Sequence, residues 1–185
     1  MRPVRREELL DYVTYDEKRF GIRSEVMAQK EPRRIHVGQH LTFLFENTTT
    51  IRYQIQEMMR AERMVREADI NHELETYNGL LGGPGELGVT LLIEVEDPVE
   101  RDAKLRAWRD LPQHLYAKLA DGRLVRFRHD EGQVGDDRVS SVQYLKLEVG
   151  RQAPVALGCD HPRLTVEVRL TDAQRRVLEE DLQQD

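Results

Sequence analysis

The sequence predicts an α+β protein, in which N-terminal helices with an αα-hairpin pack on a mainly antiparallel sheet and a C-terminal helix follows. Two patterns predict this class. Apolar residues recur at helical spacing through the first half of the chain, and short runs of alternating apolar and polar residues follow one another through the second half. Because consecutive strands joined by short turns pair antiparallel, we expect helices on one face of the sheet and partly solvated side chains on the other.

Length and composition are those of one ordinary domain. The chain has 185 residues, of which 39% are hydrophobic and 34% charged, a balance typical of globular proteins. No linker separates the two halves, so we expect a single α+β domain over residues 1–185, helix-rich over 1–86 and sheet-rich over 87–185. A helical N-terminal lobe on a C-terminal sheet lobe is the alternative.

Charge, hydropathy and cysteine content argue against several classes of protein. The net charge is -6, and nucleic-acid binding requires a concentrated positive face, so we expect no nucleic-acid partner. No apolar run approaches the ~20 residues that span a bilayer, so we expect no membrane partner. The single cysteine, Cys159, excludes an intrachain disulfide, and the charged N-terminus lacks the pattern of a signal peptide. We therefore expect a cytoplasmic protein.

The N-terminal region is predicted to be helical. Residues 6–30 indicate one or two short helices, which Gly21 weakens and Pro32 ends. Residues 34–46 alternate apolar and polar side chains and fit a strand. A helix is the alternative for this run, because its apolar part is short.

Two amphipathic helices are predicted after Asn47, which supplies N-cap chemistry together with the threonines that follow it. The first helix runs from about Thr50 to Arg66. The second is capped by Asp69 and ends at a glycine-rich segment. Residues 48–81 therefore predict an αα-hairpin.

The second half of the chain is predicted to be rich in strands. Residues 89–95 alternate cleanly, and Asp97 starts a helix that reaches about Trp108. Further strands are expected near residues 114–120, 123–128, 139–149, 154–159 and 163–170. A two-residue turn at Asp121-Gly122 would join the first two of these, and Thr171 with Gln174 forms a capping box for the C-terminal helix.

The densest concentration of functional side chains lies on the predicted αα-hairpin and just before it. If the two helices fold back on each other, Glu57 or Glu62 would meet His72 or Glu73 in a shared polar interior, which is how metal sites in helix bundles are built. The candidate polar site consists of Glu46, Asn47, Arg52, Gln54, Glu57, Arg60, Glu62, His72, Glu73, Tyr77 and Asn78.

Two interpretations of this polar cluster remain open. In the first, Glu46, Glu57 or Glu62 act as acid, base or metal ligand, and Arg52 or Arg60 orients an anion; iron or zinc would then be held by His72, Glu57 and Glu62. In the second, the same side chains form ion pairs and hydrogen bonds that support the fold. The sequence contains neither Glu-x-x-His on paired helices nor His-Glu-x-x-His, so we favour the second interpretation and predict no cofactor.

Four further motifs have a structural and a functional interpretation, and the structural one is favoured for each. His36 and His40 would chelate a metal only on a helix. The glycine-rich segment 82–86 is followed by a strand and contains no lysine, so a connection is expected rather than a phosphate cradle. Cys159-Asp160-His161-Pro162 places a thiol beside an imidazole but lies between strands, as turns do. The cations Arg123, Arg126, Arg128 and His129 could bind an anion, but acidic neighbours at Asp121, Asp130 and Glu131 favour a salt-bridged exposed strand.

Several segments, taken in order, resemble one bacterial family. They are Val37–Asn47, Gln54–Met58, Arg60–Arg63, His72–Asn78, Pro84–Leu87, Thr90–Glu94, Ser141–Leu145 and Asp160–Pro162. In this order they are similar to the family catalogued as domain of unknown function 3501, and the resemblance covers nearly the whole chain. Members of that family tend to be encoded beside rubrerythrin-like di-iron proteins and cysteine-rich iron–sulfur oxidoreductases. The resemblance supplies no agreed catalytic residues.

The resemblance implies an accessory or interaction protein of a bacterial redox or oxidative-stress system, without its own cofactor. A rubrerythrin-like protein or an iron–sulfur oxidoreductase is the expected partner. The alternative is an enzyme or a metal- or anion-binding protein that uses the polar cluster at 46–78.

Overall fold

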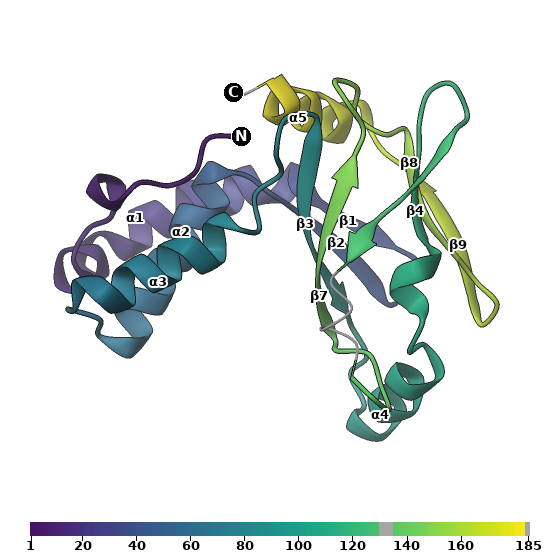
Figure 1. Cartoon of the computed structure of the whole chain (residues 1–185), viewed down its shortest axis with the longest axis horizontal. Helices are drawn as coiled ribbons and strands as arrows, with labels where there is room; N and C mark the ends of the chain where they lie inside the picture. Colours follow the sequence, from purple (N-terminus) through teal and green to yellow (C-terminus); the bar gives the residue numbers. More distant parts are fainter. Residues whose placement is uncertain (130–134, 184–185) are drawn as a thin grey trace.

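The structure is a computed structural model that describes residues 1–129 and 135–183. Within these residues the chain forms five α-helices and two antiparallel sheets, which confirms the α+β class and the C-terminal helix (Figure 1). The helical elements are η1 (Arg6–Glu8), α1 (Tyr12–Lys30), η2 (Glu31–Arg33), α2 (Thr48–Glu62), α3 (Glu67–Asn78), α4 (Pro98–Ala107), η3 (Leu111–His114) and α5 (Asp172–Gln183).

The N-terminal helix α1 is continuous over 19 residues, where the sequence predicted one or two short helices. Its first turn is capped by the Asp11 carboxylate, which accepts hydrogen bonds from the backbone N–H groups of Val13 and Thr14. Gly21 lies within the helix without breaking it. The price of a mid-helix glycine is about 0.5–1 kcal/mol, less than α1 gains by packing its buried residues Tyr15 and Val26 against α2.

The predicted αα-hairpin is present as α2 and α3. Asn47 and Thr50 form a reciprocal capping box, so α2 begins at Thr48. The helix ends at Arg63, which adopts the left-handed conformation with φ 50°. The hairpin packs on the N-terminal segment through an apolar core of Val4, Leu9, Ile51, Ile55, Met59, Ile70, Leu74 and Leu81.

The described strands form two antiparallel sheets. The first has the order β1-β2-β3-β7-β6 and the second the order β5-β4-β8-β9. The strands are β1 (Arg34–Val37), β2 (Leu41–Glu46), β3 (Glu86–Ile93), β4 (Leu115–Lys118), β5 (Leu124–Arg126), β6 (Arg128–His129), β7 (Val142–Glu148), β8 (Ala156–His161) and β9 (Leu164–Arg169).

The structure differs from the sequence prediction at two places in the sheets. Residues 34–46 form a β-hairpin of two strands rather than one strand, because Gly38 at φ 67° reverses the chain. The turn between β4 and β5 is longer than two residues, since the backbone N–H of Leu119 bonds to the carbonyl of Arg123 and Gly122 takes φ 88°. Such a three-residue loop places its glycine in the left-handed region.

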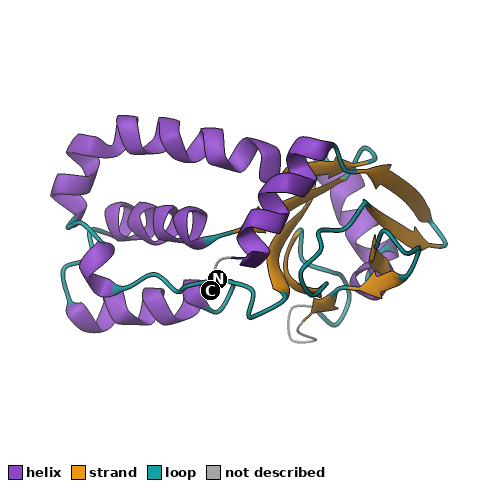
Figure 2. Ribbon diagram, turned by 90° about the horizontal axis from the view of Figure 1, so that it is seen from above, coloured by secondary structure: helices purple, strands orange, loops and turns teal. Residues whose placement is uncertain are grey.

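Both sheets enclose one hydrophobic core. Only Phe127 separates β5 from β6, so the chain crosses directly from one sheet to the other, and its ring packs 5.3 Å from that of Phe43 on β2. Leu105 of α4 and Leu178 of α5 are buried in the same core. The curved sheets and the helices beside them are seen from above in Figure 2.

The helices α1, α2 and α3 form a lobe beside the sheets, and the separate apolar core given above lies between α2, α3 and the N-terminal segment. The lobe and the sheets are joined at one end and diverge from there (Figure 1). This junction positions most of the polar side chains discussed below. In the described part of the chain, every helix is too short or too polar to cross a membrane.

Candidate functional site

A buried carboxylate, Glu46, lies where the helical lobe meets the sheets. It is 2% exposed. Its oxygens accept hydrogen bonds from the hydroxyl of Thr50 at 2.5 Å, the amide of Gln54 at 3.0 Å and the hydroxyl of Thr90 at 2.8 Å. These donors come from α2 and β3, so one side chain holds the end of β2, the hairpin and the neighbouring strand together. A buried carboxylate satisfied in this way supports the junction.

A glycine makes the junction close enough for these contacts. A Cβ atom at Gly88 would lie 1.9 Å from the backbone oxygen of Leu80. Gly88 pairs directly with Glu46 across β2 and β3. The segment after α3 can therefore run against the sheet only because position 88 has no side chain.

A buried ion pair ties the C-terminal helix to the same place. Arg33 donates to the carboxylate of Asp181 at 2.7 and 3.0 Å, and the side chain of Asp181 is fully buried. The amide of Asn47 lies 3.4 Å from the same carboxylate. The sequence analysis missed Arg33 and Asp181, although an acid among the apolar positions of the last helix was a usable signal.

Three cations lie beside this junction without a carboxylate partner among the described residues: Arg23, Lys30 and Arg34. Arg23 donates to the hydroxyl of Tyr53 at 2.7 Å, and the ammonium of Lys30 lies 5.3 Å from the centre of the same ring. Burial lowers the pKa of Lys30, and the charges of Arg34 and Arg23 lower it further against the opposing effect of Glu46. The region is therefore locally positive.

Glu57, a candidate acid or metal ligand, joins α1 to α2. Its carboxylate accepts hydrogen bonds from the hydroxyl of Tyr15 at 2.7 Å and from Arg19 at 2.8 and 2.9 Å. Arg60 lies 3.7 Å away. The guanidinium of Arg19 holds the pKa of Glu57 below its usual range, and Tyr15 adds to this effect while burial opposes it. Arg60 also approaches Asp16 of α1 at 3.5 Å.

The candidate residues on α3 serve different purposes. Asn78 bonds to both the N–H and the carbonyl of Val4, at 2.8 and 2.9 Å, and so fixes the N-terminal segment. Tyr77 is half-buried, and burial raises its pKa. His72 is exposed and Glu73 is half-buried.

The expectation that Glu57 or Glu62 meets His72 or Glu73 across the hairpin is wrong. The surfaces of α2 and α3 that face each other are apolar, Glu57 turns to α1, and Glu62 and His72 are exposed. In residues 1–129 and 135–183, no three His, Cys, Asp or Glu side chains are grouped so that they could hold a metal ion. The candidate residues divide between the sheet junction, the α1–α2 contact and the surface.

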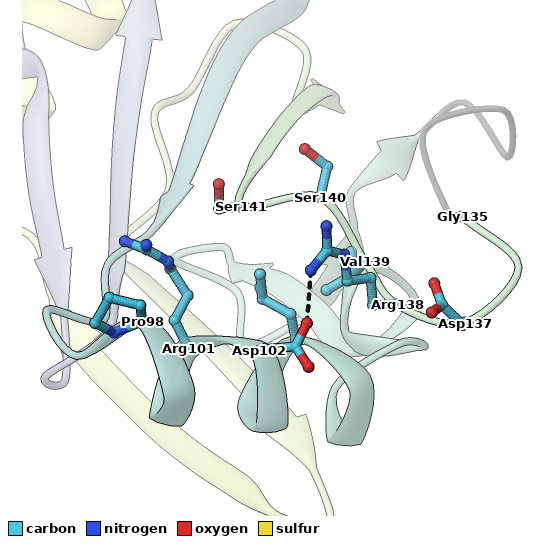
Figure 3. Close-up of a pocket in the computed structure, with 10 residues that line it drawn as sticks. Pro98, Arg101, Asp102, Gly135, Asp137, Arg138, Val139, Ser140 and Ser141 are labelled. Carbon is cyan, nitrogen blue, oxygen red and sulfur yellow. Dashed lines mark hydrogen bonds and ion pairs between the residues drawn. The ribbon is translucent and has the colours of Figure 1, made fainter.

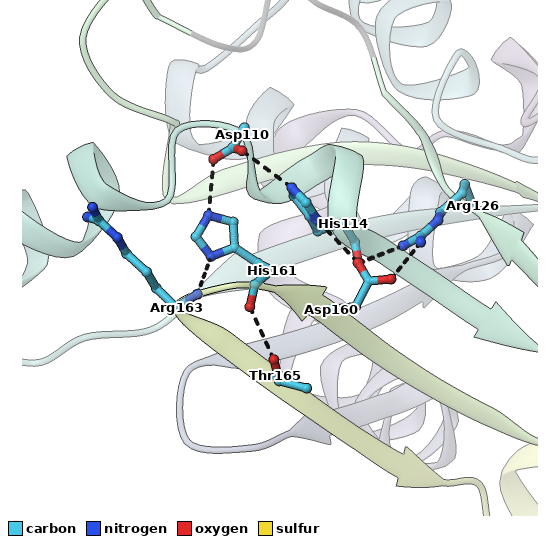
Figure 4. Close-up of polar contacts among 7 residues, drawn as sticks. All are labelled: Asp110, His114, Arg126, Asp160, His161, Arg163 and Thr165. Carbon is cyan, nitrogen blue, oxygen red and sulfur yellow. Dashed lines mark hydrogen bonds and ion pairs between the residues drawn. The ribbon is translucent and has the colours of Figure 1, made fainter.

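A polar network lies at the end of β8, which runs to His161 through most of the segment predicted as a turn (Figure 4). His161 Nε2 lies 3.0 Å from Asp110, whose other oxygen lies 3.3 Å from His114. The second ring nitrogen of His114 lies 3.2 Å from Asp160, which also pairs with Arg126. The network fastens η3 to the end of β8.

The hydrogen bonds of His161 leave neither of its ring nitrogens free to bind a metal. The backbone N–H of Arg163 donates to Nδ1 of His161 at 3.1 Å, so Nδ1 carries no proton and Nε2 donates to Asp110. A histidine that binds a metal uses the lone pair of one ring nitrogen while the other donates, and here the lone pair of Nδ1 is already taken by the N–H of Arg163. Cys159 is fully buried, and burial raises the pKa of its thiol, so it does not suit a nucleophile. The segment is structural, but the prediction of a turn is wrong for Cys159, Asp160 and His161, which lie in β8 and pair with β9; the turn is confined to Pro162 and Arg163.

The remaining motifs follow their structural interpretations. His36 contacts Thr42, whereas His40 contacts the carbonyl of Glu94. The glycine-rich segment connects α3 to β3. The cations of the exposed strand form ion pairs, Arg123 with Asp121, Arg126 with Asp160, and Arg128 with Glu86; Asp130 and Glu131 lie outside the described residues.

A surface cavity of about 610 Å³ lies beside α4 (Figure 3). Two arginines and two aspartates line it, Arg101, Asp102, Asp137 and Arg138, so the lining carries no net charge. Asp102 pairs with Arg138 at 2.6 Å. Exposed ion pairs of this kind contribute little to the free energy of folding. Because the charges balance, the cavity has no excess charge to attract an ionic ligand.

A second surface of interest is the outer face of the first sheet. Arg34, Leu44, Thr90 and Tyr144 pair in a row across β1, β2, β3 and β7, and their neighbours in each strand point into the core. Leu44 is half-buried and Tyr144 is 41% exposed. We call Arg23, Lys30, Arg34, Leu44 and Tyr144 the corner surface. It combines unpaired positive charge with accessible apolar area. The sequence analysis missed Lys30 and Arg34, because their proximity depends on how α1 meets β1.

The comparisons with known proteins support a family but no activity. The family model described as "Protein of unknown function (DUF3501)" matches residues 3–182. A crystal structure of a protein of unknown function from Burkholderia pseudomallei is similar over 98% of this chain and 100% of its own, with 32% sequence identity and a TM-score of 0.91. No curated protein matches the chain. The chain therefore belongs to the DUF3501 family.

Proposed function

We propose that this protein is an accessory protein of a bacterial redox or oxidative-stress system, acting in the cytoplasm by binding a partner protein on the corner surface. In this proposal it carries no cofactor of its own. The partner is a rubrerythrin-like protein or an iron–sulfur oxidoreductase, and it presents an acidic surface.

The observation that carries the proposal is the group of three cations at the junction. Arg23, Lys30 and Arg34 have no carboxylate partner in the described part of the chain, although 34 acidic residues are available in the sequence. Lys30 is partly buried and feels the charge of Glu46 without forming an ion pair with it. Partial burial of an ammonium that lacks a direct partner is unfavourable, and an acidic group of a partner would relieve this. Leu44 pairs with Arg34 and offers apolar contact, and Tyr144 lies two strands further along the same face of the sheet.

This combination suits a transient interface. Transient complexes form small interfaces, and opposite charges raise the rate of encounter and orient the partners more than they raise affinity. The protein as a whole is acidic, so a local positive surface would direct an acidic partner to one place.

The test uses the purified chain with the rubrerythrin-like protein and the iron–sulfur oxidoreductase of the same bacterium. Calorimetric titration at low and high salt should show saturable binding to at least one of them, weakened by salt. The variant Tyr144→Glu should bind more weakly. Absence of binding to both proteins would overturn the proposal, as would preferential binding to duplex DNA or RNA.

A further inference from the structure

A cavity of about 270 Å³ lies between α1, α2 and the segment before α1. Buried side chains form its apolar base: Tyr15, Val26 and Tyr53. Ile22 lines it from α1, and Arg52 from α2. The volume is close to the lower end of small-molecule sites, which range over ~300–1,000 Å³, so the cavity suits a small ligand.

The polar groups of the buried base already have partners. The amide of Gln56 bonds to the N–H and the carbonyl of Leu10 at 2.8 and 3.0 Å. The hydroxyl of Tyr15 donates to Glu57, and that of Tyr53 accepts from Arg23. The base therefore presents carbon surface to an occupant.

Three charged side chains line this cavity: Glu8, which is paired with Arg2, Glu25, which is exposed, and Arg52. Arg52 is the cation among them. It is half-buried, and no hydrogen bond or ion pair joins it to any described residue. A guanidinium binds a carboxylate through two parallel hydrogen bonds, and a partly desolvated site strengthens them. A cation at the side of an apolar base matches a ligand with one acidic group and a short hydrocarbon body.

We propose that this cavity binds a small apolar monocarboxylate, with its carboxylate on Arg52 and its hydrocarbon part over Tyr15, Ile22 and Val26. The cavity adjoins the corner surface, because Tyr53 in its base contacts Arg23 and Lys30. None of the five corner-surface residues lines the cavity, so the Arg52 variant tests the cavity independently of the proposed protein partner. The proposed site also gives one member of the sequence-predicted cluster, Arg52, a role that the other members do not share.

The test titrates the full chain with 3-phenylpropionate and with 4-methylpentanoate, by calorimetry and ligand-observed NMR. Matched probes are 3-phenylpropanol and 3-phenylpropylamine, which keep the ring and remove the negative charge. We expect saturable binding of a carboxylate with one site per chain, and binding of the alcohol and the amine that is weaker by about tenfold or more.

The variants locate the site. Arg52→Gln should weaken carboxylate binding about tenfold or more, and Ile22→Trp should abolish it by filling the cavity. Arg169→Gln, on an exposed arginine of β9, should bind as the wild type does. Thermal unfolding confirms that each variant is folded. The proposal is overturned if neither carboxylate binds at millimolar concentration, or if Arg52→Gln binds them as tightly as the wild type.

Discussion

The guanidinium of Arg33 and the carboxylate of Asp181 form a doubly hydrogen-bonded ion pair across 148 positions of the sequence. Both side chains are buried, and the pair joins the turn after α1 to the C-terminal helix. Asn47, which caps α2, reaches the same carboxylate. The orientation of the helical lobe relative to the sheets therefore depends on a few buried polar contacts as well as on apolar packing.

Removing one member of this pair should destabilise the whole fold. Asp181→Ala leaves the guanidinium of Arg33 buried and uncompensated, which costs about 3–5 kcal/mol. Urea unfolding followed by circular dichroism measures the loss. Arg169→Ala, at an exposed position, should change the free energy of unfolding by less than about 0.5 kcal/mol. Equal stability of the two variants would contradict the structural role assigned to the pair.

Two glycine substitutions should have opposite effects. Alanine at Gly21 meets nothing within 4 Å, so Gly21→Ala should stabilise α1 by about 0.5–1 kcal/mol. Alanine at Gly88 would collide with the backbone of Leu80, so Gly88→Ala should destabilise the protein by more than this. Thermal unfolding of both variants measures these changes in stability. A Gly88→Ala protein as stable as the wild type would show that the junction is not closely packed.

The elements of the fold were largely predictable because their signals are local. The capping boxes at Asn47 and Thr171 and the alternation in β3 each identify an element within a few residues. The division into two sheets was not predictable, since it depends on which strand pairs with which after Phe127. The continuity of α1 through Gly21 was not predictable either, because tertiary packing outweighed the low helix propensity of glycine.

The polar cluster shows where prediction from helical spacing fails. Spacing correctly places Glu57 and Arg60 on one face of a helix, but it cannot say which neighbour that face meets. The facing helix is α1, with Tyr15 and Arg19, whereas α3 meets the apolar stripe of α2. Asp181 could not be connected with Arg33 from one sequence, because nothing local relates them.

The Glu57 contacts should make stability depend on pH. Arg19 holds the pKa of Glu57 below its usual range, so its contribution is present above the unfolded pKa of about 4.3 and is lost as pH falls through the lower folded value. Glu57→Gln removes that contribution, about 1–3 kcal/mol near neutral pH. Unfolding measured from neutral to acidic pH should show a smaller acid-induced loss in the variant than in the wild type. An equal loss of stability at acidic pH in the variant and the wild type would refute this role of Glu57.

The thiol of Cys159 should be unreactive in the folded protein. It is fully buried in the shared core, and burial raises its pKa, so both access and thiolate formation are suppressed. Alkylation by iodoacetamide, followed by mass spectrometry, should be slow in buffer and fast in denaturant. Rapid labelling of the native protein would show that β8 opens locally around Cys159.

The measurement that tests the account most directly is the affinity of the double variant Arg23→Glu/Arg34→Glu for the redox partner that binds the wild type. The account predicts that reversing these charges weakens association at low salt by about tenfold or more and slows it, while Arg169→Glu binds as the wild type does. Equal affinity of the double variant and the wild type, with both folded, would contradict it.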